Sequence, residues 1–464
     1  MKYPVPVLSV LCALLISCGG GPAETPDMTG IWEGRLTGEG LELELRAVFI
    51  MEDGTITGTL DIPQQQARGL ELVNISLRGD SVFFDLPSDL GRAGFRGVAD
   101  GDTLSGSFLQ GGFTGSFVLV RTSNVVEAPA MEGEEVVITG EDCSLAGTLT
   151  LPEGTQPWAC VVLLSGSGLQ DRDEYVMGFP VFAELARILD SAGFAVLRCD
   201  DRGTGGSTGG MESFSDSVLL YDAGLMLDHV LGDDRMDPGR VGILGHSEGS
   251  NTAFRLAAER PEDVAFVVSM AGPSVTGYEL IPSQLKVILA LQGFSPEEIE
   301  AKLQAQYIIM DAALAGDSAL IDSVLREQTR MELADLPEEA VESLGDIDSY
   351  IDQAVEASAA STLGPWFRAF LTHDPAADIE RVSAPVLCLL GELDVQVIPE
   401  TNLGPMEDAL ADNPRHSIVV LENANHLFQE ALTGGVDEYA VLEPGFVHGF
   451  ADTLTAWLGS LQAD

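Results

Sequence analysis

Apolar and polar side chains alternate along residues 28–121 with a period of two, as in residues 41–45 (LELEL). Pairs of glycine and aspartate interrupt the alternation at residues 53–54, 79–80 and 100–101. A period of two places apolar side chains on one face of a β-strand, and Gly–Asp pairs favour the tight turns of hairpins. The pattern predicts a small all-β domain of antiparallel hairpins, either a barrel or a sandwich. Its expected role is packing or docking, with a ligand site inside a barrel as the alternative.

The pattern changes after a linker at residues 122–133, and a second domain is expected over residues 134–464. Short apolar runs now alternate with longer stretches of helical periodicity. The runs are residues 159–164, 194–197, 241–244, 264–270, 386–390 and 418–421, and helical stretches include 179–192 and 214–231. Buried strands that alternate with helices are typical of a mostly parallel sheet covered on both faces, so we predict an α/β domain.

Residues 275–370 lie between two predicted strands and have an acidic, helical pattern. Pro282, Pro296 and Pro337 are expected to divide this insertion into pieces, and Ser295 before Pro296 predicts a helix start with Ser295 as the N-cap. An insertion of this length is too long for an ordinary loop. We expect a helical cap over the carboxyl ends of the strands, where ligands of such sheets bind.

The first residues have the order of an export signal: a positive start, an apolar run at residues 5–16, then Ser17 and Cys18. The run is too short to span a membrane permanently. Residues 15–18 (LISC) resemble the lipobox of bacterial lipoproteins, which implies a signal peptide at residues 1–17, lipid on Cys18 and a tether at 18–27. The expected localisation is therefore outside the cytoplasm, anchored by lipid in the cell envelope. The alternative is an ordinary signal peptide that happens to contain a cysteine.

The chain is strongly acidic, with a formal net charge of -50 and only three lysines, Lys2, Lys286 and Lys302. An acidic surface repels phosphate backbones, so nucleic acid is excluded as an expected partner. Two explanations of the acidity stay open: a well-solvated surface, or adaptation to high salt, where screening removes self-repulsion.

Four cysteines, Cys143, Cys160, Cys199 and Cys388, fall outside the predicted signal and lipidation site. Most lie in or beside apolar runs, which favours free, buried thiols over a disulfide framework. Cysteine and histidine do not cluster with the spacing of a metal site, so no metal is expected.

Residues 245–249 (GHSEG) follow an apolar run and precede a helical pattern. A Gly-x-Ser-x-Gly between strand and helix is the context of a nucleophile elbow, a strained turn that exposes the serine. Side chains at Gly245 and Gly249 would clash with the neighbouring strand and helix. We therefore predict Ser247 as a nucleophile beside a helix N-terminus, where negative charge is favoured.

A serine hydroxyl needs a base, and in sheets of this kind the chain order is nucleophile, acid, base. Asp394 comes directly after the strand at residues 386–390 and is the predicted acid, with Glu392 as the alternative. His426 follows the last predicted strand and is the predicted base, with His448 as its competitor.

Two backbone N–H groups are expected to bind the oxyanion that forms during acyl transfer. One should come from Glu248, the residue after the nucleophile. The other should come from the loop after the strand at residues 159–164, and our candidate is Ser167, because a glycine on each side lets substrate approach the backbone.

These residues resemble the bacterial α/β-hydrolase esterases with an N-terminal β domain, the esterase D type, and the serine aminopeptidase-like hydrolases grouped with them. The matching stretches are residues 165–173 (SGSGLQDRD), 201–205 (DRGTG), 245–249 (GHSEG), 391–394 (GELD) and 425–426 (NH). The likeness covers about residues 134–464 and, more loosely, the β-rich start. It implies an α/β-hydrolase fold and a triad of Ser247, Asp394 and His426.

Two positions depart from the pattern of these relatives. Ser165 stands where many α/β-hydrolases have His, and Leu169 stands where relatives of this type commonly have Pro. Ion pairs are expected to hold the loop after the strand at residues 159–164, and the residues expected to form them are Asp171, Arg172 and Arg202.

The expected function is hydrolysis of small or medium acyl esters through an acyl-enzyme, without metal or organic cofactor. The expected partners are the ester substrate and, through the lipid anchor, the membrane. Two alternatives stay open: an exopeptidase whose acidic cap holds a substrate amine, and a non-catalytic lipoprotein whose β domain captures a ligand.

Overall fold

The structure is a computed structural model that describes residues 28–38, 41–52, 55–62, 67–78, 81–86, 93–110, 113–121, 133–210, 215–335, 347–439 and 442–461. The predicted signal peptide, Cys18, the tether, all but the last residue of the linker, and Pro337 lie outside these residues. The chain divides into two compact units, Met1–Ser123 and Asn124–Asp464.

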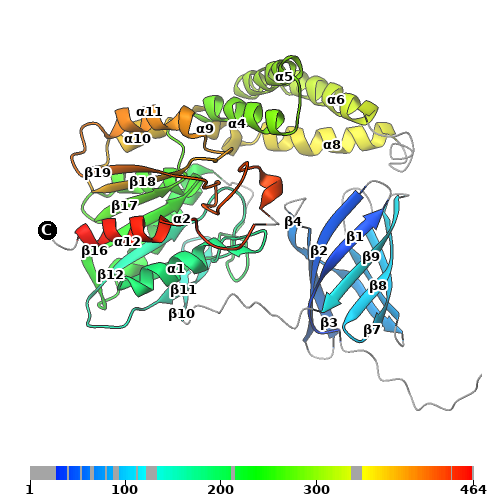
Figure 1. Ribbon diagram of the computed structural model, residues 1–464, viewed down its shortest axis with the longest axis horizontal. Coiled ribbons are helices and arrows are strands. Elements are labelled where there is room, and N and C mark those ends of the chain that lie inside the picture. The colour runs from blue at the N-terminus through cyan, green and yellow to red at the C-terminus, as the bar shows by residue number, and fades with distance from the viewer. Residues whose placement is uncertain are drawn as a thin grey trace, which may run out of the picture. The chain divides into compact units, whose positions relative to one another are not determined.

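The described residues of the first unit form nine antiparallel strands: β1 (Gly30–Gly38), β2 (Leu41–Glu52), β3 (Thr55–Ile62), β4 (Ala67–Glu71), β5 (Val73–Arg78), β6 (Ser81–Leu86), β7 (Ala93–Asp100), β8 (Thr103–Gln110) and β9 (Phe113–Arg121). They pair in the order β4-β3-β2-β1-β9-β8-β7-β6-β5. The amide N of Leu72, which precedes β5, donates a 2.8 Å hydrogen bond to the carbonyl O of Gly58 on β3 and so brings the two edges together. The all-β prediction is confirmed as a nearly closed barrel (Figure 1).

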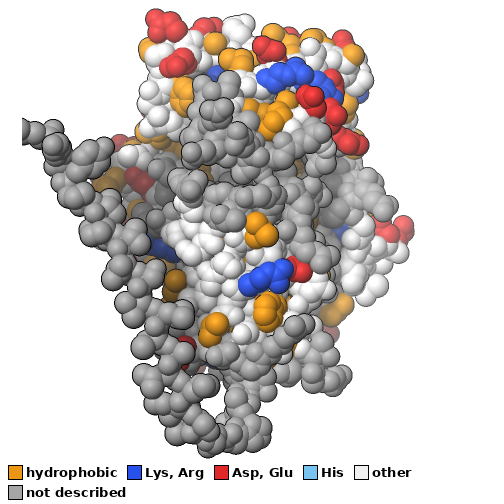
Figure 2. Space-filling view, turned by 90° about the vertical axis from the view of Figure 1, so that its right-hand side faces the viewer, with side chains coloured by type: hydrophobic (Ala, Val, Ile, Leu, Met, Phe, Trp, Pro, Cys, Tyr) orange, Lys and Arg blue, Asp and Glu red, His pale blue; other side chains and the backbone are white. Residues whose placement is uncertain are grey.

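Aromatic side chains fill the inside of this barrel. Trp32, Phe84, Phe95 and Phe117 are each at most 2% exposed. The rings of Phe84 and Phe95 stack at 4.7 Å, and those of Phe95 and Phe117 meet edge to face at 5.4 Å. On the face drawn in Figure 2, apolar side chains lie in separate spots among polar and backbone atoms. The described residues thus favour the packing role over a ligand site inside the barrel.

The second unit is built on an eight-stranded sheet: β10 (Glu134–Thr139), β11 (Ser144–Thr150), β12 (Trp158–Leu164), β15 (Phe194–Cys199), β16 (Met236–His246), β17 (Phe266–Met270), β18 (Val386–Gly391) and β19 (His416–Leu421). The order is β10-β11-β15-β12-β16-β17-β18-β19. All neighbours from β15 to β19 run parallel, and β10 and β11 join antiparallel at one edge. The mostly parallel sheet was predicted; the β10–β11 hairpin was not.

Helices cover both faces of the sheet, as the α/β prediction requires. One face packs against α2 (Asp216–Leu231), α3 (Glu248–Glu259) and α11 (Pro399–Leu410), through side chains such as Leu227, Phe254 and Leu410. The other packs against α1 (Val181–Ser191) and α12 (Phe450–Leu461), through Leu185 and Leu454. The short strands β13 (Tyr175–Val176) and β14 (Phe179–Pro180) form a separate hairpin before α1. Cys143, Cys160, Cys199 and Cys388 are free and buried, as predicted.

The insertion between β17 and β18 is helical. It contains α4 (Gly277–Leu291), α5 (Pro296–Ala315), α6 (Ser318–Asp335), α8 (Ile347–Thr362), α9 (Pro365–Thr372) and α10 (Pro375–Ile379). The predicted helix start is confirmed, because the Ser295 hydroxyl accepts a 3.3 Å hydrogen bond from the amide N of Glu298, with Pro296 as the first helical residue. The predicted break at Pro282 is wrong, since Pro282 lies inside α4. Near the start of a helix a proline removes one backbone hydrogen bond, and the helix can continue through it.

Two hydrogen bonds connect this insertion to the carboxyl ends of the strands. Gln284 on α4 donates from Nε2 to the carbonyl O of Gln396, just after β18, at 2.6 Å. Trp366 on α9 donates from Nε1 to Oε1 of Glu248, just after β16, at 2.8 Å. No helix among the described residues is long and apolar enough to cross a membrane.

Candidate active site

Ser247 lies in a strained turn between β16 and α3. Its φ and ψ are 51° and -117°, a conformation that side-chain-bearing residues rarely adopt. A Cβ on Gly245 would lie 2.2 Å from the carbonyl O of Gly249, and one on Gly249 would lie 2.2 Å from the carbonyl O of Leu164 on β12. Both glycines are therefore sterically required, as the sequence pattern predicts, and Ser247 stays half-exposed at the end of the strand.

Asp394 and His426 lie in hydrogen-bonding contact. Nδ1 of His426 is 2.8 Å from Oδ2 of Asp394, and the two residues are 4% and 3% exposed. The other carboxylate oxygen of Asp394 accepts from the amides of Gln396 and Val397 at 2.7 and 2.8 Å. These donors fix the carboxylate in place, and the carboxylate in turn fixes a proton on Nδ1 of His426. The second ring nitrogen, Nε2, is left to act as a base.

Glu392, the alternative acid, points to another partner. Its Oε2 accepts a 2.9 Å hydrogen bond from the amide N of Asn423. The competing base, His448, lies in the turn before α12. The geometry thus groups Asp394 with His426 and leaves both alternatives outside that contact.

The residue before the serine joins the elbow to the histidine loop. Nε2 of His246 is 3.1 Å from the carbonyl O of His426, and the two imidazole rings lie 4.9 Å apart. A Cβ on Gly166 would lie 3.4 Å from Cβ of Ser247, so the loop after β12 faces the serine. The ends of β12, β16, β18 and β19 therefore converge on one place.

Two carboxylates, the buried Glu174 and the half-buried Asp201, hold the loop at residues 165–170. Oε1 of Glu174 accepts from the amide N of Gly166 at 2.7 Å. Asp201 accepts from the hydroxyl of Ser165 at 2.7 Å and from the amide N of Gln170 at 2.8 Å. The amide of Gly166 is therefore engaged by a side chain, and the role of the Ser167 amide as an oxyanion donor stays a prediction.

The environment of Asp201 disfavours its charged form. Burial raises the pKa of Asp201 to about 7, although its hydrogen bonds to Ser165 and Gln170 act in the opposite direction. At neutral pH the protonated and ionised forms of this carboxyl group are therefore both populated.

The arginines expected to hold this loop pair with carboxylates outside it. Arg172 binds Asp200 at 2.9 Å and Glu135 at 2.8 Å. Arg202 binds Asp222 at 2.6 Å and Asp142 at 2.9 Å. The carboxylate of Asp171 accepts from the amides of residues 173 and 175. The direct contacts to the loop come instead from Glu174 and Asp201, which sequence reasoning missed; the nearest signal was their place beside the motifs at residues 165–173 and 201–205.

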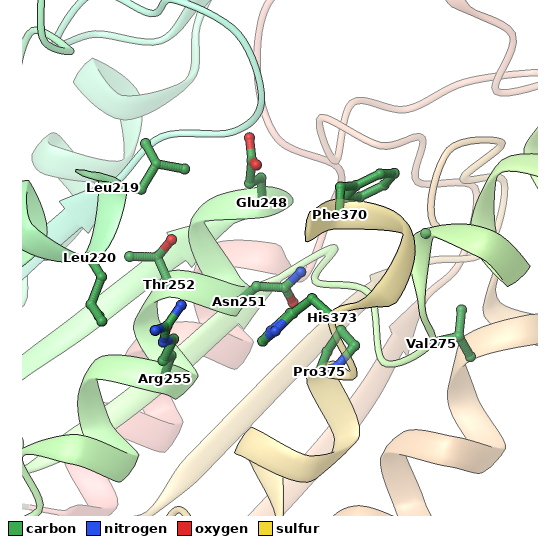
Figure 3. A pocket seen from close by; sticks show the side chains of 11 residues that line it. Leu219, Leu220, Glu248, Asn251, Thr252, Arg255, Val275, Phe370, His373 and Pro375 are labelled. Carbon is green, nitrogen blue, oxygen red and sulfur yellow. The ribbon is translucent and has the colours of Figure 1, made fainter. Parts of the chain in front are cut away.

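Glu248, the other expected oxyanion donor, is the first residue of α3, so its amide lies at the positive end of the helix dipole. Its side chain borders a pocket shown in Figure 3, where it projects between Leu219 and Phe370. The pocket is lined by Leu219, Leu220, Glu248, Asn251, Thr252, Arg255, Val275, Gly277, Phe370, His373 and Pro375. Residues of α2, α3, α4 and α9 thus form a partly apolar hollow beside the residue that follows Ser247.

The amino-acid sequence matches a known protein family. The model of the alpha/beta hydrolase family matches residues 161–434, more than half of the 464 residues. Esterase EstD of Thermotoga maritima is 25% identical over 306 residues, which cover 65% of this chain and 61% of EstD, so the chain spans less than two thirds of that relative.

Solved structures also align with the chain. Proline iminopeptidase of Mycobacterium smegmatis is 17% identical with a TM-score of 0.44, over 71% of this chain and 100% of that one. A Pyrococcus furiosus esterase is 15% identical with a TM-score of 0.41, over 74% of this chain and 95% of that one. The family assignment itself rests on the sequence match from β12 to the loop after β19: the protein belongs to the alpha/beta hydrolase family.

Proposed function

We propose that the protein is a serine carboxylesterase in which Ser247 is the nucleophile, His426 the general base and Asp394 the orienting acid. The observation that carries the proposal is the 2.8 Å contact between His426 and the buried Asp394, next to an elbow that holds Ser247 at a φ of 51°. Burial strengthens this contact, because water does not compete for the carboxylate.

The reaction follows from these positions. Oγ of Ser247 bonds to the ester carbonyl carbon while its proton passes to Nε2 of His426. The amides of Ser167 and Glu248 stabilise the oxyanion, and the C–O bond to the alcohol breaks as His426 returns the proton to that oxygen. Water, deprotonated by His426, then attacks the acyl-enzyme; the acid leaves and Ser247 regains its proton.

Small or medium acyl esters are the proposed substrates. EstD, the relative described above, is named an esterase. The hollow beside Glu248 has apolar walls at Leu219, Val275 and Phe370, which suit a short hydrocarbon group.

The test is hydrolysis of p-nitrophenyl acetate and butyrate by the wild type and by Ser247→Ala. We expect the variant to lose activity by about 10⁴-fold or more, because the covalent step is removed. Ser191→Ala, at an exposed position at the end of α1, is the matched control and should behave as wild type. Equal rates for Ser247→Ala and wild type would refute the proposal, and faster cleavage of aminoacyl anilides than of esters would reassign it to an exopeptidase.

We also propose that the chain is exported and anchored by lipid on Cys18, as the order of residues 5–18 indicates. The mature protein from the membrane fraction should begin at Cys18 and carry the mass of attached acyl chains, and Cys18→Ala should move to the soluble fraction. An unmodified Cys18 in membrane-associated protein would contradict this proposal.

A further inference from the structure

We infer that Glu174 is a positioning residue. Its carboxylate sets the distance between the proposed oxyanion loop (residues 165–170) and the nucleophile elbow (residues 245–249). The inference rests on the proposed function and extends it to a side chain that lies outside the triad. Glu174 follows the stretch at residues 165–173 and lies just before β13.

A single oxygen of Glu174 joins two parts of the centre. Oε1 accepts from the amide N of Gly166 at 2.7 Å and is 2.8 Å from Nδ1 of His246. Gly166 directly precedes Ser167, and His246 directly precedes Ser247. The same imidazole reaches the carbonyl O of His426 through Nε2 at 3.1 Å. One carboxylate therefore connects the oxyanion loop, the elbow and the loop of the general base.

The partners of His246 define its protonation state. Nε2 faces a carbonyl oxygen and Nδ1 faces a carboxylate, so each ring nitrogen has an acceptor as its partner, which favours the doubly protonated, positively charged ring. Burial disfavours that charge, but the Glu174 carboxylate outweighs it, and the pKa of His246 is raised. His246 and Glu174 thus form a buried ion pair, 4% and 1% exposed at their side chains.

Glu174 is also held in an unfavourable state. Its φ is 44°, in the left-handed region that side-chain-bearing residues avoid. Its second oxygen, Oε2, is buried and has no hydrogen-bond partner among the described residues. Strained backbone and unsatisfied buried groups both destabilise a fold and concentrate at functional sites. The two contacts of Oε1, to the amide of Gly166 and to His246, offset this cost and explain why a glutamate lies here.

Loss of this carboxylate should act on the transition state more than on substrate binding. The oxyanion amide and the Ser247 hydroxyl must both be in place when the tetrahedral intermediate forms, and an error of about 1 Å between them reduces the rate about 100-fold. The pocket beside Glu248 does not include Glu174, so substrate affinity should change little.

The experiment compares Glu174→Gln with Asp173→Asn in the full chain, by steady-state kinetics on p-nitrophenyl butyrate. Asp173 is the neighbouring acid and forms its own ion pair with the buried Arg198 at 2.7 Å, but its side chain makes no contact with the loop at residues 165–170 in the described structure. We expect kcat of Glu174→Gln to fall about 10- to 100-fold with KM within about 3-fold, and kcat of Asp173→Asn to stay within about 3-fold. Equal kcat for the two variants would overturn the inference.

A double-mutant cycle separates positioning from folding. His246→Asn removes one of the two donors to Oε1 and should lower kcat by a similar factor, and the double variant should be no slower than the slower single variant. A loss of kcat in the double variant equal to the product of the two single losses would overturn the inference. If Glu174→Gln does not fold, the kcat-to-KM split of His246→Asn provides the same test. Full activity of Ser247→Ala would instead refute the proposed function.

Discussion

Every buried side chain in the described part of the barrel is apolar, whereas the hydrolase unit buries Glu174, Asp200, His246, Asp394 and His426. These charged or titratable groups follow the carboxyl ends of β12, β15, β16, β18 and β19. Burial of an ionisable group is unfavourable unless partners compensate for it. The described barrel interior contains no buried ionisable group, whereas the hydrolase interior contains several, at the proposed site and also away from it, as at Arg202 and Asp378. Buried charge thus distinguishes the hydrolase unit from the barrel.

The largest effect should come from the buried acid of the proposed triad. Asp394→Asn keeps the shape of the side chain but no longer fixes the proton on Nδ1 of His426, and kcat should fall about 10⁴-fold. Glu392→Gln, two residues earlier, alters an acid that binds only the amide of Asn423 among the contacts described above. Its kcat should stay near wild type. A greater loss in Glu392→Gln would reverse the assignment of the acid.

The corresponding change in the barrel should affect stability and not chemistry. Phe84 is 1% exposed and stacks on Phe95, so Phe84→Ala should lower the free energy of unfolding of the barrel by about 3–5 kcal/mol. Val98→Ala, at a position 44% exposed on the same barrel, should have little effect. Urea unfolding followed by the fluorescence of Trp32 measures both, in chains whose other tryptophans are replaced by phenylalanine. Equal midpoints would show that the aromatic interior does not stabilise the barrel.

Asp201 should make the stability of the hydrolase unit depend on pH. Its pKa is about 7 in the folded protein and about 4 in an unfolded chain, so its contribution to stability is full below pH 4 and is lost as the pH rises to about 7. Asp201→Asn cannot ionise, and its stability relative to wild type should rise by about 3–4 kcal/mol between pH 4 and pH 8. The measurement is urea unfolding at several pH values. A difference that is constant with pH would contradict the raised pKa.

The smallest expected effect concerns the helical insertion. Trp366→Phe removes the N–H that binds Glu248 at 2.8 Å and retains an aromatic ring beside Phe370. A hydrogen bond to a carboxylate contributes about 1 kcal/mol here, so kcat/KM should fall about 5-fold. Trp457→Phe, on α12, is the control and should leave kcat/KM unchanged. An unchanged kcat/KM in Trp366→Phe would show that the contact between α9 and Glu248 does not contribute to activity.

The fold was largely predictable because hydrophobic periodicity records which faces are buried. The apolar runs from residue 159 to residue 421 became the parallel strands of the sheet, and the alternation of residues 28–121 became the barrel. The edge hairpin β10–β11 was missed, since each strand is short and only partly apolar. Pro282 was misjudged, because a proline near a helix start is tolerated.

The candidate site was predictable only where motifs mark it. The glycines at positions 245 and 249 identify the elbow, and the ends of apolar runs indicate Asp394 and His426, whose role stays a prediction. Glu174 carried no such mark: it is one of 73 acidic residues, and its partner His246 is 72 positions away in the chain. Pairings of this kind arise from the folded arrangement and not from local sequence.

The most direct measurement is the site of modification by a fluorophosphonate, which reacts with an activated serine hydroxyl. Mass spectrometry of the labelled wild type should locate the adduct on Ser247, and Asp394→Asn should label far more slowly than Glu392→Gln. An adduct on another residue, or an unlabelled folded protein, would contradict the account.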